Sequence, residues 1–279
     1  MKDPDCVNFL QQILPKLHLR WSGFQRVRRQ VCRRLRNRFL KLGLEDFTSY
    51  RTYLLDHPDE WSNVDACCRI TISRFYRDAV VFEQLCQVLP TLIQLGQERR
   101  DSSICCWCAG CASGEEVYTL KPIEHFRLSG LKLFLPLHIL GTDIDEYLLS
   151  RARRGCYPKG TLKELPKPWI AKAFDGDRQY CLKSAFREGI EFEQQDIRKQ
   201  MPDSLFHLIL CRYLAFTYFE PMLQQKVLQG ILDRLVPEGI LVIGKKESLP
   251  INGKSQLIKL SSTGIYQKKS ANYPPSNPR

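Results

Sequence analysis

The sequence has no apolar run long enough to cross a membrane. Its longest such stretch, from Leu131 to Gly141, is interrupted by Lys132, Pro136 and His138, whereas a membrane-spanning helix needs about 20 consecutive apolar residues. The N-terminus also lacks the uninterrupted apolar core of a secretory signal peptide. We therefore expect no membrane insertion and a cytoplasmic location.

Low-complexity tracts and internal repeats are absent as well. Hydrophobic residues make up 43% of the 279 residues, aromatic residues 10% and charged residues 26%. These values lie near the averages of globular proteins and exclude collagen-like, repetitive and wholly disordered chains. The length is sufficient for one large domain or two small ones.

The twelve cysteines lack the spacing of a zinc site. Four of them lie within seven residues, at Cys105, Cys106, Cys108 and Cys111, with no histidine nearby. A structural zinc site normally draws on two separated ligand pairs, and neighbouring residues on a strand point to opposite faces. We therefore expect no metal site. Without an export signal, we expect buried, reduced thiols in place of a disulfide framework.

Acidic residues are missing from one long segment of the chain. The net charge is +12, and residues 16–41 contain ten basic residues and no acidic one. Within this segment Val27, Val31, Leu35 and Phe39 recur every four positions, which predicts a helix with one apolar stripe ending near Gly43. We expect its basic face, Arg26–Lys41, to dock an acidic protein partner, although a solvated helix face is the competing interpretation.

The patterns divide the chain into two parts. The first hundred residues read as helical, with Asp46 as a helix cap and His57–Pro58 as a break. Short apolar runs then alternate with helical ones, at 104–109, 137–141, 205–212 and 240–244, which is typical of buried parallel strands in an α/β domain. We predict a helical domain over residues 1–88, an α/β domain over 89–269 and a disordered tail over 270–279.

Small residues follow the first predicted strand. The turn Gly110–Gly114 precedes a helix that begins with two acids, so its backbone and the helix N-terminus can approach a nucleotide-like ligand. The same acids are also favoured by the helix dipole alone. After the next strand, Asp143 is the candidate for ribose hydroxyl groups and Asp145 is the better helix N-cap.

Four ordered motifs together resemble the chemotaxis receptor methyltransferase (CheR) family. They are Arg74–Asp78 (RFYRD), Trp107–Glu116 (WCAGCASGEE), Thr142–Asp145 (TDID) and Leu210–Arg212 (LCR). The resemblance implies a class I, Rossmann-like methyltransferase domain with a mostly parallel seven-stranded sheet, preceded by a helical domain. It also implies S-adenosylmethionine as cofactor and glutamate carboxylates of a protein as the methyl acceptor.

The resemblance also places the site on named residues. It assigns cofactor binding to Thr71, Ser73, Arg77, Ala109, Glu115, Asp143, Asp196, Ile197, Cys211 and Arg212, and the methyl-transfer centre to Arg77 and Tyr218. These roles agree with the chemistry, because methyl transfer is an in-line displacement that depends on positioning. A guanidinium such as that of Arg77 recognises a carboxylate in a planar fork, and an ionised glutamate needs no general base.

This chain departs from the family pattern at several positions. Tyr213 stands where the family usually has asparagine, one extra residue precedes Tyr218, His207 replaces an acid, and Lys121–Pro122 is expected to interrupt a helix. Three alternatives therefore stay open: a methyltransferase for small-molecule carboxylates, a methyltransferase for nucleic acid, and an inactive cofactor-binding or interaction protein. The net charge favours the nucleic-acid alternative, but the sequence lacks the signatures of RNA-binding modules. We expect a monomer.

Overall fold

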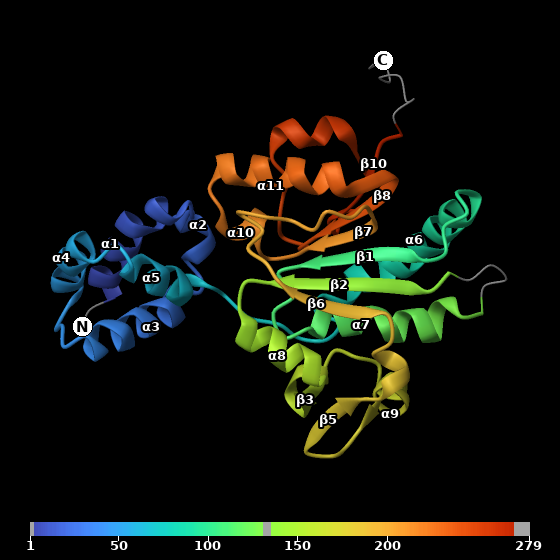
Figure 1. The fold of residues 1–279 in the computed structure, drawn as a ribbon, viewed down its shortest axis with the longest axis horizontal. Helices are drawn as coiled ribbons and strands as arrows, with labels where there is room; N and C mark the ends of the chain where they lie inside the picture. The colour runs from blue at the N-terminus through green and yellow to red at the C-terminus, as the bar shows by residue number, and fades with distance from the viewer. Residues whose placement is uncertain (1–2, 131–134, 271–279) are drawn as a thin grey trace. The chain divides into compact units, whose positions relative to one another are not determined.

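The computed structural model describes residues 3–130 and 135–270, and it divides into two compact units (Figure 1). The first unit contains residues up to Thr71 together with the segment 217–223, and the second contains the remainder. Of the tail expected at 270–279, only Ser270 lies within the described residues.

The first unit is helical. It contains the helices α1 (Asp3–Ile13), α2 (Trp21–Phe24), α3 (Arg28–Lys41), α4 (Phe47–Asp56) and α5 (Glu60–Cys68), with a short 3₁₀ turn at Leu14–Leu17. Its core is aromatic: the ring of Phe9 stacks on Phe47 at 4.9 Å and on Tyr50 at 5.7 Å, and Phe39 contacts both. The segment 217–223 joins this unit through a backbone bond from Arg20 to Tyr218.

Helix α3 follows the predicted apolar stripe. Val31, Leu35 and Phe39 are fully buried on one face, whereas the basic positions between them are exposed or half-buried. The helix ends at Lys41, and Gly43 then adopts a φ of 74°, a left-handed conformation that suits glycine. The next helix is capped as expected, because the Asp46 side chain accepts a hydrogen bond from Ser49 N at 2.7 Å.

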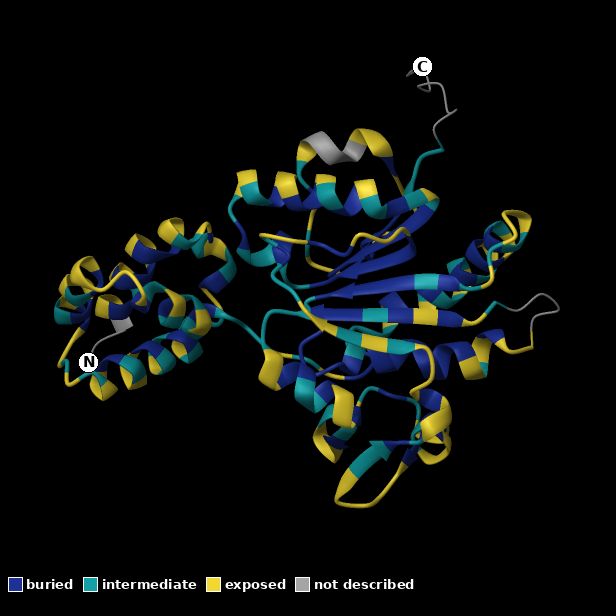
Figure 2. Ribbon diagram, in the orientation of Figure 1, coloured by how far each residue is buried: buried dark blue, intermediate teal, exposed yellow. Residues whose placement is uncertain are grey.

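The second unit is built on a seven-stranded sheet with the strand order β6-β2-β1-β7-β8-β10-β9. The strands are β1 (Ile104–Ala109), β2 (Leu137–Asp143), β6 (Ile190–Gln194), β7 (Phe206–Cys211), β8 (Leu235–Ile243), β9 (Leu257–Lys259) and β10 (Ile265–Lys268). Strand β10 runs antiparallel to both of its neighbours, β8 and β9, and the other strand pairs of the sheet are parallel. This order confirms the expected mostly parallel sheet, and β1 and β7 are almost continuously buried because they lie at its centre (Figure 2).

Helices cover this sheet. They are α6 (Ala79–Glu98), α7 (Glu115–Ile123), α8 (Glu146–Arg154), α10 (Ala215–Tyr218) and α11 (Pro221–Arg234), with short 3₁₀ turns at Ser184–Phe186 and Ile251–Gln256. The segment 217–223, which clusters with the helical unit, contains the end of α10 and the start of α11. Side chains of α6 and α7 share one hydrophobic cluster with Ile104, Cys106 and Cys108 of β1.

The domain boundary expected at residue 88 differs from the division seen in the structure. That boundary lies inside α6, and the chain divides instead between Thr71 and Ile72. The apolar face of α6 packs on the sheet, so the helix belongs to the α/β unit although its sequence reads like the helices before it. Among the described residues α6 is also the one helix with the length and apolarity of a membrane span, and its buried side chains match those of a core helix.

A second, small sheet was not predicted. It contains β3 (Cys156–Pro158), β5 (Gln179–Leu182) and β4 (Phe174–Asp175) in the antiparallel order β3-β5-β4. A 3₁₀ turn at Lys159–Leu162 and helix α9 (Lys167–Ala173) lie between β3 and β4 in the chain. Strands of two to four residues are too short to produce a recognisable alternation of polar and apolar side chains.

The expectation that all cysteines are reduced is wrong for four of them. Disulfides join Cys6 to Cys32, between α1 and α3, and Cys156 to Cys181, which are directly opposed on β3 and β5. The remaining eight cysteines are free, and Cys106, Cys108 and Cys111 are buried as expected. Burial raises the pKa of these three thiols.

The helix break expected at Lys121–Pro122 is also wrong. Helix α7 continues through Pro122 to Ile123 and passes into a π-helical turn at Glu124–Leu128. Pro122 donates no backbone hydrogen bond, yet the helix continues through it. Lys121 is buried and pairs with Glu124 at 2.5 Å, and both side chains bond the backbone of Leu137 where β2 begins.

Candidate functional site

The carboxyl ends of four parallel strands lie next to one another at one edge of the large sheet. Ala109, the last residue of β1, is in register with Thr142 of β2, and Asp143 is in register with Gln194 of β6. On the other side of β1, Cys108 faces Leu210 of β7. The loops that carry the predicted site residues in this unit therefore leave the sheet together, where open α/β sheets bind ligands.

The turn after β1 has the backbone conformation that the small residues predict. Gly110, Ala112 and Gly114 have φ values of 72°, 49° and 86°. A Cβ on Gly114 would lie 2.9 Å from the Cβ of Ala152, so this position has no room for a side chain. The amide N of Ala112 donates to Asp143 Oδ2 at 2.8 Å and thereby joins the turn to the end of β2.

Asp143 and Asp145 have different contacts, and the prediction that Asp145 caps the next helix is confirmed. Asp145 is the N-cap of α8 and accepts hydrogen bonds from Tyr147 N and Leu148 N. Asp143 instead accepts from Ala112 N through one oxygen and from Asp145 N through the other, at 3.0 Å. The Asp143 carboxylate is thus held in place by backbone donors at the edge of the sheet.

Glu115 begins α7 and is buried, with 2% of its surface exposed. The Ser113 hydroxyl donates to both of its carboxylate oxygens at 2.9 Å. No cation pairs with this carboxylate within the described ranges of the chain. A buried carboxylate with a neutral donor is suited to receive a positively charged ligand group.

Asp196 and Ile197 follow the end of β6. The amide N of Gln195 donates to the carbonyl oxygen of Asp143 at 2.9 Å, so this segment lies beside the end of β2. The Asp196 carboxylate forms a two-pronged ion pair with the guanidinium of Arg198, and Ile197 is buried. The segment therefore offers a backbone edge and an apolar side chain, with the Asp196 charge neutralised.

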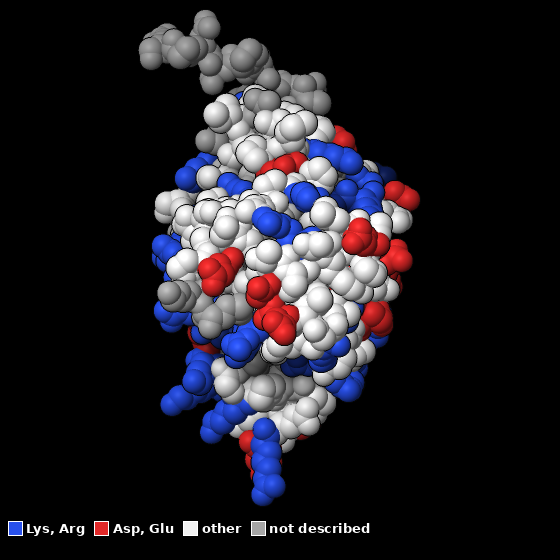
Figure 3. All heavy atoms as spheres, turned by 90° about the vertical axis from the view of Figure 1, so that its left-hand side faces the viewer, with Lys and Arg blue, Asp and Glu red and all other residues white. Residues whose placement is uncertain are grey.

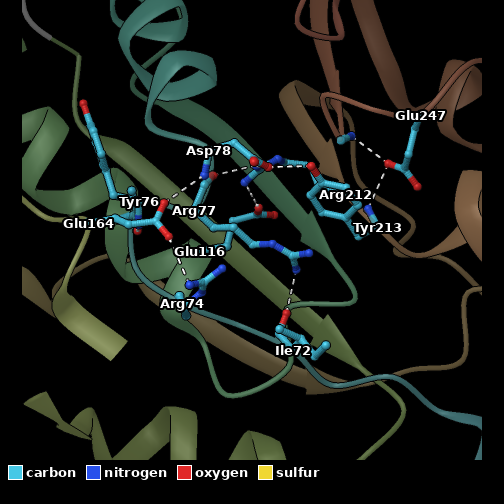
Figure 4. Close-up of polar contacts among 12 residues, drawn as sticks. Ile72, Arg74, Tyr76, Arg77, Asp78, Glu116, Glu164, Arg212, Tyr213 and Glu247 are labelled. Atoms are coloured by element: carbon cyan, nitrogen blue, oxygen red, sulfur yellow. Dashed lines mark hydrogen bonds and ion pairs between the residues drawn. The ribbon is translucent and has the colours of Figure 1, made fainter. Parts of the chain in front are cut away.

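Arg212 follows the buried Cys211 at the end of β7, and 2% of its side chain is exposed. Its guanidinium pairs with Glu116 at 2.7 Å and Asp78 at 2.9 Å and donates to the carbonyl oxygen of Arg77 at 2.7 Å (Figure 4). Burial alone would lower the pKa of Arg212, but the two carboxylates outweigh it and raise the pKa. Arg212 therefore ties three segments together: the start of α7, the residues before α6 and the end of β7.

Four residues that sequence reasoning did not place in the site complete this network. Tyr213 donates its hydroxyl to Asp78 Oδ2 at 2.6 Å, and its backbone N donates to Glu247 Oε2 at 2.8 Å. Glu116 is the last residue of the WCAGCASGEE motif, where the helix dipole alone also favours an acid, and Tyr213 is a departure from the family pattern. Signals were available in the RFYRD and LCR motifs, since Asp78 and Tyr213 directly adjoin the predicted Arg77 and Arg212.

Arg77 lies beside this network with its guanidinium half-exposed. One of its nitrogens donates to the carbonyl oxygen of Ile72 at 2.7 Å, and its guanidinium carbon lies 4.0 Å from the centre of the Tyr213 ring (Figure 4). No carboxylate of the described residues forms an ion pair with Arg77. The guanidinium thus keeps donors for a ligand.

Two predicted residues belong to the helical unit and are described with it. Tyr218 lies in the segment 217–223, where its ring packs 5.1 Å from Phe24. Thr71 is the last residue of that unit before the chain enters the α/β unit. Ser73, on the α/β side of this division, is half-buried.

His207 belongs to the opposite end of the sheet. It lies near the start of β7, where one ring nitrogen accepts from Cys105 N at 3.1 Å and the other contacts Asp101 at 2.9 Å. Burial lowers the pKa of His207, but its contacts with Cys105 and Asp101 raise it more. His207, which departs from the family pattern, therefore connects β7 to β1 and to the turn before β1.

Comparison with known proteins finds a family model, described as the CheR methyltransferase, SAM binding domain, that matches residues 71–265. A chemotaxis protein methyltransferase of Borreliella burgdorferi is 26% identical over 77% of this chain and 78% of its own length. One from Listeria innocua is 31% identical over 64% of this chain and 66% of its own.

A 104.1 kDa protein of Rhodobacter capsulatus is 27% identical over 78% of this chain, but the match covers 23% of that longer protein. Among solved structures, the N-methyltransferase NodS of Bradyrhizobium japonicum matches 69% of this chain and 99% of its own with a TM-score of 0.38 and 13% identity. The fold assignment rests on the sheet order described above.

Proposed function

The chain belongs to the CheR methyltransferase family, and on that premise we propose that it transfers the methyl group of S-adenosylmethionine to glutamate carboxylates of a protein. It is an S-adenosylmethionine-dependent methyltransferase of the CheR type. The observation that supports a carboxylate acceptor is Arg77, whose guanidinium is half-exposed beside the site and pairs with no carboxylate of the described residues.

The residues at the sheet edge fit the cofactor. Asp143 is fixed by backbone donors in a position suited to ribose hydroxyls, and the Glu115 carboxylate suits an amino group of positive charge. Ala109 and the turn after it allow close approach of the backbone, and Ile197 supplies an apolar contact for a base. We assign Cys211 and Arg212 to the wall of this site, and Thr71 and Ser73 to the segment leading to it.

When bound, the cofactor supplies an electrophilic methyl group on sulfur. The task of the protein is then to bring a carboxylate oxygen into line with that methyl group. We assign this task to Arg77, because a guanidinium presents parallel donors that match a carboxylate. The acceptor needs no base, since a glutamate with a pKa of about 4.3 is already ionised at neutral pH. We retain Tyr218 as the second residue of the transfer centre.

We propose that the acidic protein substrate docks on α3. Of the predicted basic face Arg26–Lys41, the exposed arginines are Arg26, Arg29, Arg33 and Arg36. Arg34 and Arg38 instead serve the fold, since Arg34 bonds the backbone of Arg69 and Arg38 pairs with Glu60. Basic side chains are also prominent among the charged groups on the face drawn in Figure 3. We propose a monomeric, cytoplasmic enzyme.

The first test measures cofactor binding by calorimetric titration with S-adenosylmethionine and its demethylated product. Asp143→Ala should weaken binding of both at least tenfold, whereas Asp177→Ala, an exposed residue of the α/β unit, serves as the matched control. If neither compound binds to the wild type, the sheet edge is not a cofactor site.

The second test measures methyl transfer with a labelled cofactor to acidic peptides that contain glutamate, with glutamine-substituted peptides as controls. A carboxyl methyl ester releases volatile methanol in base, whereas an N-methyl group does not. Arg77→Ala should reduce methanol release at least a hundredfold with little change in cofactor affinity, and Arg127→Ala should not. Base-stable label on nucleic acid or on a small molecule would overturn the protein-glutamate proposal.

A further inference from the structure

Tyr213 has an unusual backbone conformation that the surrounding residues hold in place. Its φ is 54°, in the left-handed region that non-glycine residues rarely adopt. Glu247 Oε2 accepts hydrogen bonds from both Tyr213 N, at 2.8 Å, and Gly244 N, at 2.6 Å. A residue held in such a conformation by several contacts is often found at a functional site.

Gly244 provides the space for the Tyr213 ring. A Cβ on Gly244 would lie 2.7 Å from Tyr213 Cε1 and 2.8 Å from Glu247 Oε2, which is closer than atoms of this kind approach in proteins. The absence of a side chain at the end of β8 thus lets the ring lie against the backbone. The orientation of the ring is therefore determined by the loop from Gly244 to Glu247.

The ring also contacts Arg77, and the guanidinium carbon of Arg212 lies farther away, 5.7 Å from the ring centre. The guanidinium carbon of Arg77 lies 4.0 Å from the ring centre, a distance typical of a cation–π contact. The ring is fixed at its far end, because its hydroxyl donates to Asp78 Oδ2 at 2.6 Å. Burial, followed by this bond, raises the pKa of Tyr213 to about 12, so the hydroxyl keeps its proton at neutral pH.

An aromatic contact has a different effect on Arg77 from that of a carboxylate contact. A carboxylate would occupy the in-plane donors of the guanidinium and neutralise its charge, whereas a ring stacked on its face leaves those donors available. Among the described residues, the one hydrogen bond that Arg77 donates through its guanidinium is to the carbonyl oxygen of Ile72. The ring and this carbonyl together restrict the side chain and leave the remaining donors for a ligand.

We propose that Tyr213 is a positioning residue that holds the Arg77 guanidinium in the orientation that receives the acceptor carboxylate. The aromatic ring is the part that acts on Arg77, and the hydroxyl, Glu247 and Gly244 fix the ring. This inference rests on the proposed function, because it specifies how the arginine of the transfer centre is kept in place. The residue that departs from the family pattern then supports catalysis instead of obstructing it.

The kinetic test compares Tyr213→Phe with Tyr213→Leu. Phenylalanine keeps the ring and loses the hydroxyl, so kcat for methyl transfer to the glutamate peptide should stay within about threefold of the wild type. Leucine removes the ring, so kcat should fall at least tenfold while the Kd of the cofactor changes less than threefold. Equal losses in both variants, or a cofactor Kd that rises in step with the loss of kcat, would overturn the proposal.

A spectroscopic readout tests the contact independently of activity. A proton that lies over an aromatic ring is shifted upfield, so the Nε–H resonance of Arg77 should lie upfield in the wild type and in Tyr213→Phe, and should move downfield in Tyr213→Leu. Arg77→Lys identifies this resonance, and the Arg153 resonance serves as the control. An Arg77 resonance that is the same in the wild type and Tyr213→Leu would overturn the proposal.

The two readouts separate this inference from the proposed function. If the wild type methylates no glutamate peptide but the Arg77 resonance responds to Tyr213→Leu, the protein-glutamate function fails and the contact of Tyr213 with Arg77 stands. If the wild type is active and the resonance does not respond, the positioning role fails alone.

Discussion

The exposed arginines of α3 and the buried Arg212 of the α/β unit use the same side chain in opposite ways. In the helical unit, Arg29, Arg33 and Arg36 of α3 are exposed. In the α/β unit, the Arg212 side chain is 2% exposed and pairs with Glu116 and Asp78. The first set keeps its charge free for a partner, whereas the second has its charge fully engaged within the fold.

The difference follows from solvation. An exposed guanidinium stays hydrated, so neither its presence nor its removal has much effect on the free energy of unfolding. A buried guanidinium is stabilised only through its carboxylate partners, and removing it leaves those carboxylates buried and unpaired. A buried arginine therefore fixes the relative positions of segments, and an exposed one is available for recognition.

The largest expected effect is that of Arg212→Met. This change leaves the carboxylates of Asp78 and Glu116 without their cation and should lower the free energy of unfolding of the α/β unit by about 3–5 kcal/mol. Arg153→Met, at an exposed ion pair with Glu146, should cost less than about 1 kcal/mol. Urea unfolding followed by tryptophan fluorescence measures both, and similar losses in the two variants would contradict the difference between buried and exposed arginines.

The disulfides offer the next comparison, because each unit contains one. Cys6–Cys32 and Cys156–Cys181 close loops of similar length, with separations of 26 and 25 residues. Replacing either pair by serine should lower the free energy of unfolding by about 3 kcal/mol under oxidising conditions. Thermal unfolding with and without reductant checks this, and a reductant effect that persists when both pairs are replaced would contradict it.

The buried acid of the helical unit gives a smaller effect that depends on pH. Glu60 accepts bonds from Arg38, Tyr50 and Asn63. Its hydrogen bond to Arg38 outweighs burial and lowers its pKa below the ordinary value of 4.5. The resulting stabilisation is therefore fully present above pH 4.5 and is lost as the pH falls through the lower pKa of the folded state.

Glu60→Gln should accordingly lower the free energy of unfolding of the helical unit by about 2 kcal/mol at pH 7. The difference between this variant and the wild type should shrink as the pH falls below 4.5. Circular dichroism at 222 nm during denaturation measures it, and Glu45→Gln on an exposed side chain is the control. A difference that grows in acid would show that the sign is wrong.

The smallest effect on stability is expected on α3. Replacing Arg29, Arg33 and Arg36 by glutamine should change the free energy of unfolding by less than about 0.5 kcal/mol. The same variant should bind an acidic polypeptide such as polyglutamate at least tenfold more weakly at low salt, with less difference at high salt. Replacing Arg127, Arg153 and Arg178 removes the same charge from the α/β unit, and an equal loss of binding there would exclude a specific docking face.

Local signals predicted many of the elements correctly. The strand at Ile104–Ala109, the cap at Asp46 and the N-cap at Asp145 depend on a few neighbouring residues, and the structure has each of them as expected. The boundary expected at residue 88 falls inside α6, because the partner of the apolar face of this helix is a sheet that begins later in the chain. The disulfides were missed because pairing depends on distances between cysteines far apart in the sequence.

By itself, the sequence determined the periodic and local features of this protein: the basic helix with its apolar stripe, the alternation of strands and helices, and the motifs that identify its family. These features depend on residues within a few turns of one another, where periodicity and capping act. Only the tertiary structure decided that Arg212 is buried between Glu116 and Asp78, and that Tyr213 packs on Arg77. These contacts join residues up to 136 positions apart, as from Arg77 to Tyr213, and they form only when the sheet brings the ends of its strands together.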